Sequence, residues 1–261
     1  MNRRPWVLLA IVLLLGLPLL AQDGSKDQII GTDHDLTANP DTSALVADPN
    51  GNGQICSFCH IPHQLPTDNR VLLWNHQFGS TTLYTPYSSA SLKATINQLN
   101  STNSTQQKGE AFYSLACLSC HDGQTGVNVV YRRPDGYTGE GTPGAIGTAS
   151  GNTMNDVDPS GMHTIGTDLS NDHPVNFTYN TALATADGGL YDPAGGTAIS
   201  AGLRTVRAKT TDSHGAVTQP VLFNDTVQCA TCHNPHSQTN APYLRVDNAS
   251  SALCLRCHST T

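Results

Sequence analysis

The chain has 261 residues and a formal net charge of −7, and only 13% of its residues are charged, against about 25% in an ordinary globular protein. The acidic balance excludes a nucleic-acid-binding protein, which needs a basic surface, and the scarcity of charge excludes classical disorder. The 23 glycines and 15 prolines argue against a helical bundle, so we expect a folded chain that is rich in loops and has a weak aliphatic core.

Residues 1–21 have the composition of a signal peptide. Arg3 and Arg4 precede an apolar run of 15 residues, and Ala21 is a small residue suited to a cleavage site. The run is shorter than the ~20 residues that a membrane-spanning helix needs, which disfavours the alternative of a membrane anchor. We therefore expect the chain to be exported and to have no membrane association after cleavage. The expected location is extracellular or at the cell surface, with the periplasm as the alternative.

Helices are predicted at three places. In 88–99, leucine and isoleucine recur at helical spacing after a serine, which predicts a short helix. A polar linker is expected at 100–107, and a second helix at 110–120. The third helix is expected near the end of the chain, at 250–257.

The segment 134–220 is rich in Gly, Asp, Thr and Pro, and this composition disfavours helices. Within and beside this segment we expect only short strands, at 127–133, 176–179 and 205–209. A stretch of this length with so little regular structure would count against a compact domain unless it wraps around something else.

All eight cysteines fall into four copies of the pattern Cys-x-x-Cys-His, which is typical of c-type haem attachment. The two thiols, one helical turn apart, bond to the vinyl groups of a porphyrin, and the following histidine binds the iron. Paired cysteines also form zinc sites and redox dithiols, but neither needs a histidine after every pair. We predict four covalently bound haem c groups. The attachment residues are Cys56, Cys59, Cys117, Cys120, Cys229, Cys232, Cys254 and Cys257, and the proximal iron ligands are His60, His121, His233 and His258.

Seven further histidines are available for the other side of each iron, whereas the only methionines beyond the leader are Met154 and Met162. Mostly bis-histidine ligation is therefore expected, and it implies low reduction potentials. Two of these histidines follow a motif in the sequence Cys-His-x-Pro-His, too close to their own proximal histidine to reach the opposite face of the same haem. We expect them to ligate a neighbouring haem. The predicted distal ligands are His34, His63, His173 and His236, and the weaker candidates are His76, His163 and His214.

The fold class that follows is a loop-rich multihaem cytochrome c, in which a few short helices carry the motifs, a few short strands are present and stacked haems form the core. We expect 22–261 to be one tetrahaem domain. Its parts are an N-terminal arm at 22–54, the first two haems at 55–133, a loop-rich wrap at 134–225 and the last two haems at 226–261.

Four sequence stretches occur in a characteristic order: CSFCHIPH followed by LLWN, then CLSCHDG, then NDHPVNF, then a Cys-x-x-Cys-His-Asn-Pro-His. This order resembles that of the extracellular tetrahaem cytochromes that polymerise into filaments, the cytochrome nanowires, and the resemblance extends from about His34 to His258. It implies that all haems are bis-histidine, that they stack closely, and that one axial histidine comes from a neighbouring subunit. We expect His34 to be that ligand, because its segment has no apolar pattern that would hold it to its own subunit.

The expected function is extracellular long-range electron transfer through four closely spaced haems, without enzymatic activity. The expected partners are identical subunits in a filament and redox proteins or extracellular electron acceptors. A monomeric periplasmic electron shuttle is the main alternative. A multihaem reductase is less favoured, because it needs an iron with a free position and all four motifs end in histidine.

Overall fold

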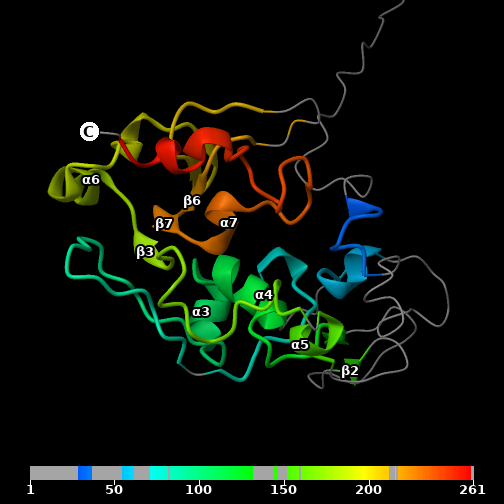
Figure 1. Cartoon of the computed structure of the whole chain (residues 1–261). Helices are drawn as coiled ribbons and strands as arrows, with labels where there is room; N and C mark the ends of the chain where they lie inside the picture. The colour runs from blue at the N-terminus through cyan, green and yellow to red at the C-terminus, as the bar shows by residue number, and fades with distance from the viewer. Residues whose placement is uncertain are drawn as a thin grey trace, which may run out of the picture.

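The computed structural model describes residues 29–36, 55–61, 71–81, 83–131, 144–145, 152–158, 160–211, 215 and 217–259. Short helices and strands are joined by long loops in these residues, so the prediction of a loop-rich chain is confirmed (Figure 1). The leader at 1–21 and the histidines His63 and His214 lie outside the described residues. None of the helices in the described part of the chain is long and apolar enough to cross a membrane.

Helix α4, Phe112–His121, is the longest helix that the structure describes, and it confirms the helix expected at 110–120. Leu115 and Leu118, three residues apart and so on one face, are fully buried. They pack into a cluster of aromatic and aliphatic side chains that surrounds the helix. The other members of this cluster are Trp74, Phe78, Tyr84, Leu99, Ala111, Phe112 and Leu169.

The prediction of a helix at 88–99 is wrong. The backbone there is irregular, and its amides are used elsewhere: the N–H of Asn97 donates to the carbonyl of Asn176 at 3.0 Å. The apolar positions are used for tertiary contacts of an extended chain, so their helical spacing is accidental.

The polar stretch 100–107 is not a plain linker either, because α3, Ser104–Lys108, begins in it. The Asn103 side chain caps this helix by accepting from two backbone amides.

A five-stranded antiparallel sheet forms the centre of the C-terminal part, in the order β3-β7-β6-β5-β4. Central β6 is buried at all three positions, as expected for a strand covered on both faces. Asn224 and Asp225 both have positive φ, which is the geometry of the tight turn that joins β6 to β7. The strands are β3 Phe177–Thr178, β4 Ala198–Ser200, β5 Leu203–Thr205, β6 Val221–Phe223 and β7 Thr226–Val227.

The strands expected at 176–179 and 127–133 are present as β3 and as β1, Val129–Val130, which pairs with β2, Gly144–Ala145. The prediction of a strand at 205–209 is wrong, because β5, Leu203–Thr205, ends at the first of these residues. The expectation of no helix between 134 and 220 is wrong. Two short helices occur there, because side chains cap the free backbone amides of their first turns. Thr153 and Asp156 form a capping box at one helix, and the Asn180 side chain accepts from the Leu183 amide at the other. They are α5, Met154–Val157, and α6, Thr181–Asp187.

The remaining elements are single turns, and several of them carry the cysteine motifs. The helix expected at 250–257 is instead two 3-10 turns, because Ser250 and Ser251 have positive φ and interrupt it. These elements are α7 Cys229–Cys232 and the 3-10 turns η1 Ile55–Phe58, η2 Val71–Leu73, η3 Pro193–Gly195, η4 Ala249–Ser251 and η5 Cys254–Arg256.

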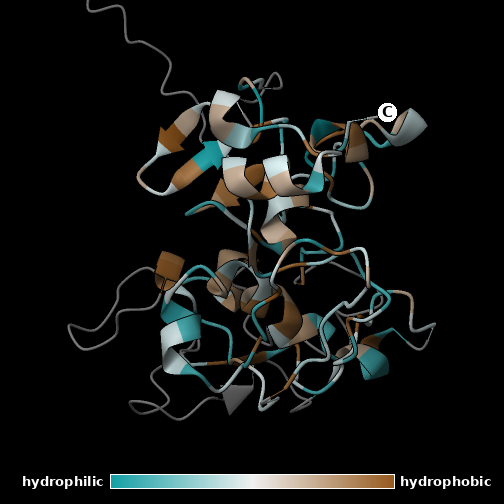
Figure 2. Cartoon of the chain, turned by 90° about the vertical axis from the view of Figure 1, so that its left-hand side faces the viewer, coloured by the Kyte–Doolittle hydropathy of each residue, from teal (hydrophilic) through white to brown (hydrophobic). Residues whose placement is uncertain are grey.

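Apolar side chains form four small clusters in the described residues, not one large core. In Figure 1 the sheet, α6, α7 and the red C-terminal segment lie above α3, α4 and α5, and Figure 2 shows the brown apolar segments distributed over both parts. Separate small clusters are what a chain with a weak aliphatic core forms. The predicted core of stacked haems and the predicted division of 22–261 stay predictions.

Candidate haem-binding site

Each Cys-x-x-Cys-His motif forms one helical turn. We number them in chain order as motif 1 (56–60), motif 2 (117–121), motif 3 (229–233) and motif 4 (254–258). The histidine N–H donates to the carbonyl of the first cysteine at 2.8, 3.1 and 2.9 Å in motifs 1, 3 and 4, and motif 2 is the last part of α4. This turn brings the two thiols and the imidazole of one motif to the same region, as haem attachment requires. All eight cysteines are free thiols, so no disulfide competes for them.

Three of the four motif histidines are held in one orientation by the same interaction. The ring Nδ1 of each donates to a backbone carbonyl from a loop that follows the motif, which fixes the tautomer and leaves Nε2 with its lone pair. This is the arrangement of a histidine that binds a metal through Nε2. The pairs are His60 with Leu72 O at 2.7 Å, His121 with His163 O at 2.7 Å and His233 with Pro242 O at 3.0 Å.

Three motif histidines also face a second histidine from a distant part of the chain. A metal–imidazole bond is about 2 Å long, so two imidazoles on opposite sides of one metal ion have ring centres about 6 Å apart. The three observed spacings match this value. The ring centres are 6.0 Å apart for His60 and His236, 6.3 Å for His34 and His121, and 6.4 Å for His173 and His258.

The N-terminal segment 29–36 places His34 beside motif 2 of its own chain. The His34 ring stacks on Tyr243 at 4.2 Å, and its Nδ1 donates to the carbonyl of Pro235 at 3.0 Å. This placement within one chain counts against the expectation that His34 reaches a neighbouring subunit. The sequence argument missed these contacts because they come from residues more than 200 positions away and not from an apolar pattern in the arm.

His236 lies at motif 1, although it follows motif 3 by only three residues. This agrees with the argument that a histidine so close to a proximal ligand faces a different haem. Its partner in the sequence pattern, His63, lies outside the described residues, so the corresponding expectation for His63 stays a prediction. Among the described residues, His233 is the one motif histidine that has no second histidine ring at the 6 Å spacing.

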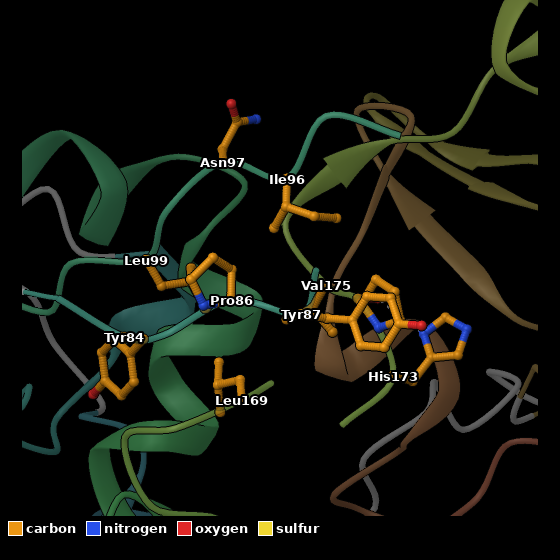
Figure 3. Close-up of a pocket in the computed structure, with 10 residues that line it drawn as sticks. Tyr84, Pro86, Tyr87, Ile96, Asn97, Leu99, Leu169, His173 and Val175 are labelled. Atoms are coloured by element: carbon orange, nitrogen blue, oxygen red, sulfur yellow. Dashed lines mark hydrogen bonds between the residues drawn. The ribbon is translucent and has the colours of Figure 1, made fainter. Parts of the chain in front are cut away.

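His173 faces motif 4 from the loop before β3, and its Nδ1 donates to the carbonyl of Pro174 at 2.9 Å. Figure 3 shows His173 at one end of a pocket that is lined mostly by apolar and aromatic side chains, with Tyr87 beside it. The other labelled lining residues are Tyr84, Pro86, Ile96, Asn97, Leu99, Leu169 and Val175.

The two weaker candidates that the structure describes are engaged elsewhere. His76 is almost completely buried, and its two ring nitrogens lie 2.8 Å from the carbonyl of Gln77 and 3.1 Å from that of Gly126. His163 binds Asp158 through its ring, and it contributes only its carbonyl to His121. Both ring nitrogens of His76 are thus occupied, and its Nε2 also contacts the Cys120 thiol at 3.4 Å, whereas the Nδ1 of His163 is bound to Asp158.

The buried environment favours the neutral imidazoles that iron binding needs, and it keeps two of the motif thiols protonated. Burial lowers the pKa of His34 to about 4 and also lowers the pKa of His121 and of His233, so these imidazoles are neutral at pH 7. A metal-binding histidine must be neutral. Burial raises the pKa of the Cys59 and Cys257 thiols to about 12, which keeps both protonated.

The thiols of successive motifs lie close to one another. Cys117 of motif 2 and Cys229 of motif 3 share a hydrogen bond, which raises the pKa of the first and lowers that of the second. A buried polar link fixes this contact, because the Ser114 hydroxyl of α4 donates to the Gln228 side chain at 2.6 Å and accepts from the Cys229 amide at 3.0 Å. Motifs 2 and 3 are therefore neighbours in space.

The donor set fits haem c better than the alternatives considered. Among the described residues, which include all eight cysteines, no three or more His, Cys, Asp or Glu side chains are grouped to hold a metal ion, so the cysteines do not form a four-cysteine zinc site. A c-type haem needs only two thiols and one or two neutral imidazoles from the protein. The motifs and the histidine pairs supply these groups.

Residues 220–261 match a family model described as a doubled CXXCH motif, and this match contains motifs 3 and 4. No curated protein matches the chain. The match and the motifs indicate a multihaem c-type cytochrome, a class of protein that carries covalently bound haem and transfers electrons. Proteins of this class are usually exported.

Proposed function

We propose that this chain binds four haem c groups, each between two histidines, and conducts electrons along them. The observation that carries the proposal is the set of three histidine pairs with ring centres 6.0 to 6.4 Å apart, each pair containing one motif histidine. A haem iron held in this way accepts and releases one electron at low potential. The chain's own residues attach the group, fix its orientation and fill both axial positions.

The residues divide this work in a defined way. The eight motif cysteines hold the four groups covalently, and His60, His121, His233 and His258 are the proximal ligands. We assign His236 to motif 1, His34 to motif 2 and His173 to motif 4. For motif 3 we propose His63, because it occupies in Cys-His-Ile-Pro-His the position that His236 occupies in Cys-His-Asn-Pro-His.

The arrangement supports electron transfer and not a reaction with a substrate. The ring-centre spacing of the described pairs supports a histidine on each side of the iron, and a substrate needs one side free. The contact between the Cys117 and Cys229 thiols supports closely spaced groups, because both cysteines bond to the edge of a porphyrin. We therefore propose that the chain is not an enzyme and that a multihaem reductase is the least favoured function.

We further propose that the protein works outside the cell as a filament of identical subunits, which passes electrons to redox proteins or extracellular acceptors. The resemblance to filament-forming tetrahaem cytochromes supports this assembly. One observation favours the monomeric periplasmic shuttle: His34 completes the pair at motif 2 within one chain, so that site needs no neighbour. Electron microscopy of the secreted fraction separates the two, since the shuttle would give no filaments.

The haem assignment is tested by mass spectrometry and spectroscopy of the purified protein. We expect the mass of four covalent haems, electron paramagnetic resonance signals of low-spin iron only, and a Soret band that carbon monoxide leaves nearly unchanged after reduction. Fewer than four haems would contradict the proposed cofactor content. Strong carbon monoxide binding at one haem would contradict bis-histidine ligation and favour the reductase.

A further inference from the structure

The loop that follows α5 contains an exposed acidic turn that the electron-transfer function does not use directly. In it, both carboxylate oxygens of Asp158 accept hydrogen bonds. Oδ1 accepts from the hydroxyl and the amide of Ser160, and Oδ2 accepts from the amide and the ring Nδ1 of His163, both at 2.8 Å. Four donors on one carboxylate hold Ser160 and His163 to Asp158 in a single turn.

The same turn ends on the proximal ligand of motif 2. The carbonyl of His163 accepts from His121 Nδ1 at 2.7 Å, and the carbonyl of His121 accepts from the amides of Ile165 and Gly166 at 2.8 and 3.1 Å. The ring and the backbone of His121 are therefore both bound to residues 163–166. The position of the His163 carbonyl depends on the Asp158 carboxylate, which binds the amide and the ring of that same residue.

We propose that Asp158 is a positioning residue for the axial ligand His121, acting through the backbone carbonyl of His163. This inference rests on the proposed function, in which His121 binds iron. A carbonyl that accepts from Nδ1–H raises the basicity of the ligating nitrogen, and partners of this kind tune the metal site. A firmly held carbonyl at His121 thus favours the oxidised iron and lowers the reduction potential at motif 2.

The exchange Asp158→Asn tests this directly. An asparagine amide has one acceptor oxygen and presents an NH₂ group on the other side, so it cannot accept from all four donors. The His163 carbonyl should then be held less firmly. We expect one of the four midpoint potentials to rise, with the equilibrium constant for reduction of that haem changing about tenfold, which corresponds to about 59 mV for one electron.

The chain offers a matched control two residues away. Asp156 is an exposed carboxylate within α5, where it accepts from the amide and hydroxyl of Thr153 and caps the helix, and it has no hydrogen bond to His163. Asp156→Asn removes the same charge and should leave all four potentials unchanged. Ser160→Ala removes one donor to Asp158 and should give a smaller rise at the same haem.

The readouts are a spectropotentiometric titration and the low-spin electron paramagnetic resonance signals, whose g values report the orientation of the axial ligands. Both variants should affect the haem at motif 2, so the haem whose potential shifts in Asp158→Asn must be the haem that becomes high-spin in His34→Ala. The inference is overturned if Asp158→Asn with four haems leaves every potential and g value unchanged, or if Asp156→Asn gives the same shift. If Asp158→Asn does not mature, Ser160→Ala decides by the same criterion. Failure of the proposed function would show differently, as missing or high-spin haems in the unaltered protein.

Discussion

Motifs 2 and 4 have the same five-residue pattern but are supported in different ways. Motif 2 completes a ten-residue helix whose Leu115 and Leu118 are fully buried in the main apolar cluster. Motif 4 is a 3-10 turn, and its first cysteine, Cys254, is exposed. Its backbone is bound to the segment before η3, where the Tyr191 amide donates to the carbonyl of Cys257 at 2.8 Å. The motif thus specifies the attachment chemistry, and the surroundings determine how firmly it is held.

The largest expected effects, on the spin state of one haem iron, come from removing the proposed distal histidine at motif 2 or at motif 4. His34→Ala and His173→Ala should each keep four covalent haems but convert one of them to a high-spin iron that binds carbon monoxide, because one axial ligand is lost. Ile30→Ala, an exposed change in the same arm as His34, is the control. If all irons stay low-spin in His34→Ala, another histidine serves motif 2 and the pairing is wrong.

The next prediction compares how strongly side-chain packing stabilises motif 2 and motif 4. Leu118→Ala removes a fully buried side chain in α4, and such changes cost about 2–5 kcal/mol of unfolding free energy. Leu255→Ala, inside motif 4 and only half-buried, should cost less than about 1 kcal/mol. Chemical denaturation of the haem-loaded proteins measures both. Equal losses would show that motif 4 is held by packing as firmly as motif 2.

A smaller effect is expected from the hydroxyl that supports motif 4. Tyr179 is buried, and its hydroxyl donates to the carbonyl of Tyr191 at 2.6 Å, next to the backbone that binds Cys257. Tyr179→Phe should lower the unfolding free energy by about 1 kcal/mol, the typical value of one such hydrogen bond, and should speed amide exchange near motif 4. Unchanged exchange there would mean that the hydroxyl does not support the motif.

The smallest effect is a pH dependence near motif 2. Hydrogen bonds from Ser160, followed by those from His163, lower the pKa of Asp158 from its usual 3.8 to about 2. A carboxylate with a lowered pKa stabilises the folded state fully above its unfolded pKa and loses this contribution as the pH falls through the folded value. The turn at 158–163 should therefore stay closed above about pH 4 and open toward pH 2. A carbonyl-carbon NMR titration measures this, and a midpoint near 3.8 would contradict the closed turn.

The sequence by itself determined the chemistry of this protein. The four motifs indicate covalently bound haem c and predict its attachment cysteines and proximal histidines, because covalent attachment requires those residue types in adjacent positions. The loop-rich character also followed from composition, and α4 from its local pattern. These inferences depend only on residues that are neighbours in the chain.

Only the tertiary structure decided which histidine faces which motif. The pairs at motifs 1, 2 and 4 join residues about 80 to 180 positions apart, and no local pattern encodes such contacts. The same holds for the carbonyls of Leu72, His163 and Pro242, which orient the proximal rings. The expected helix at 88–99 failed for this reason as well, because partners such as Asn176 used its amides and overrode a weak helical propensity.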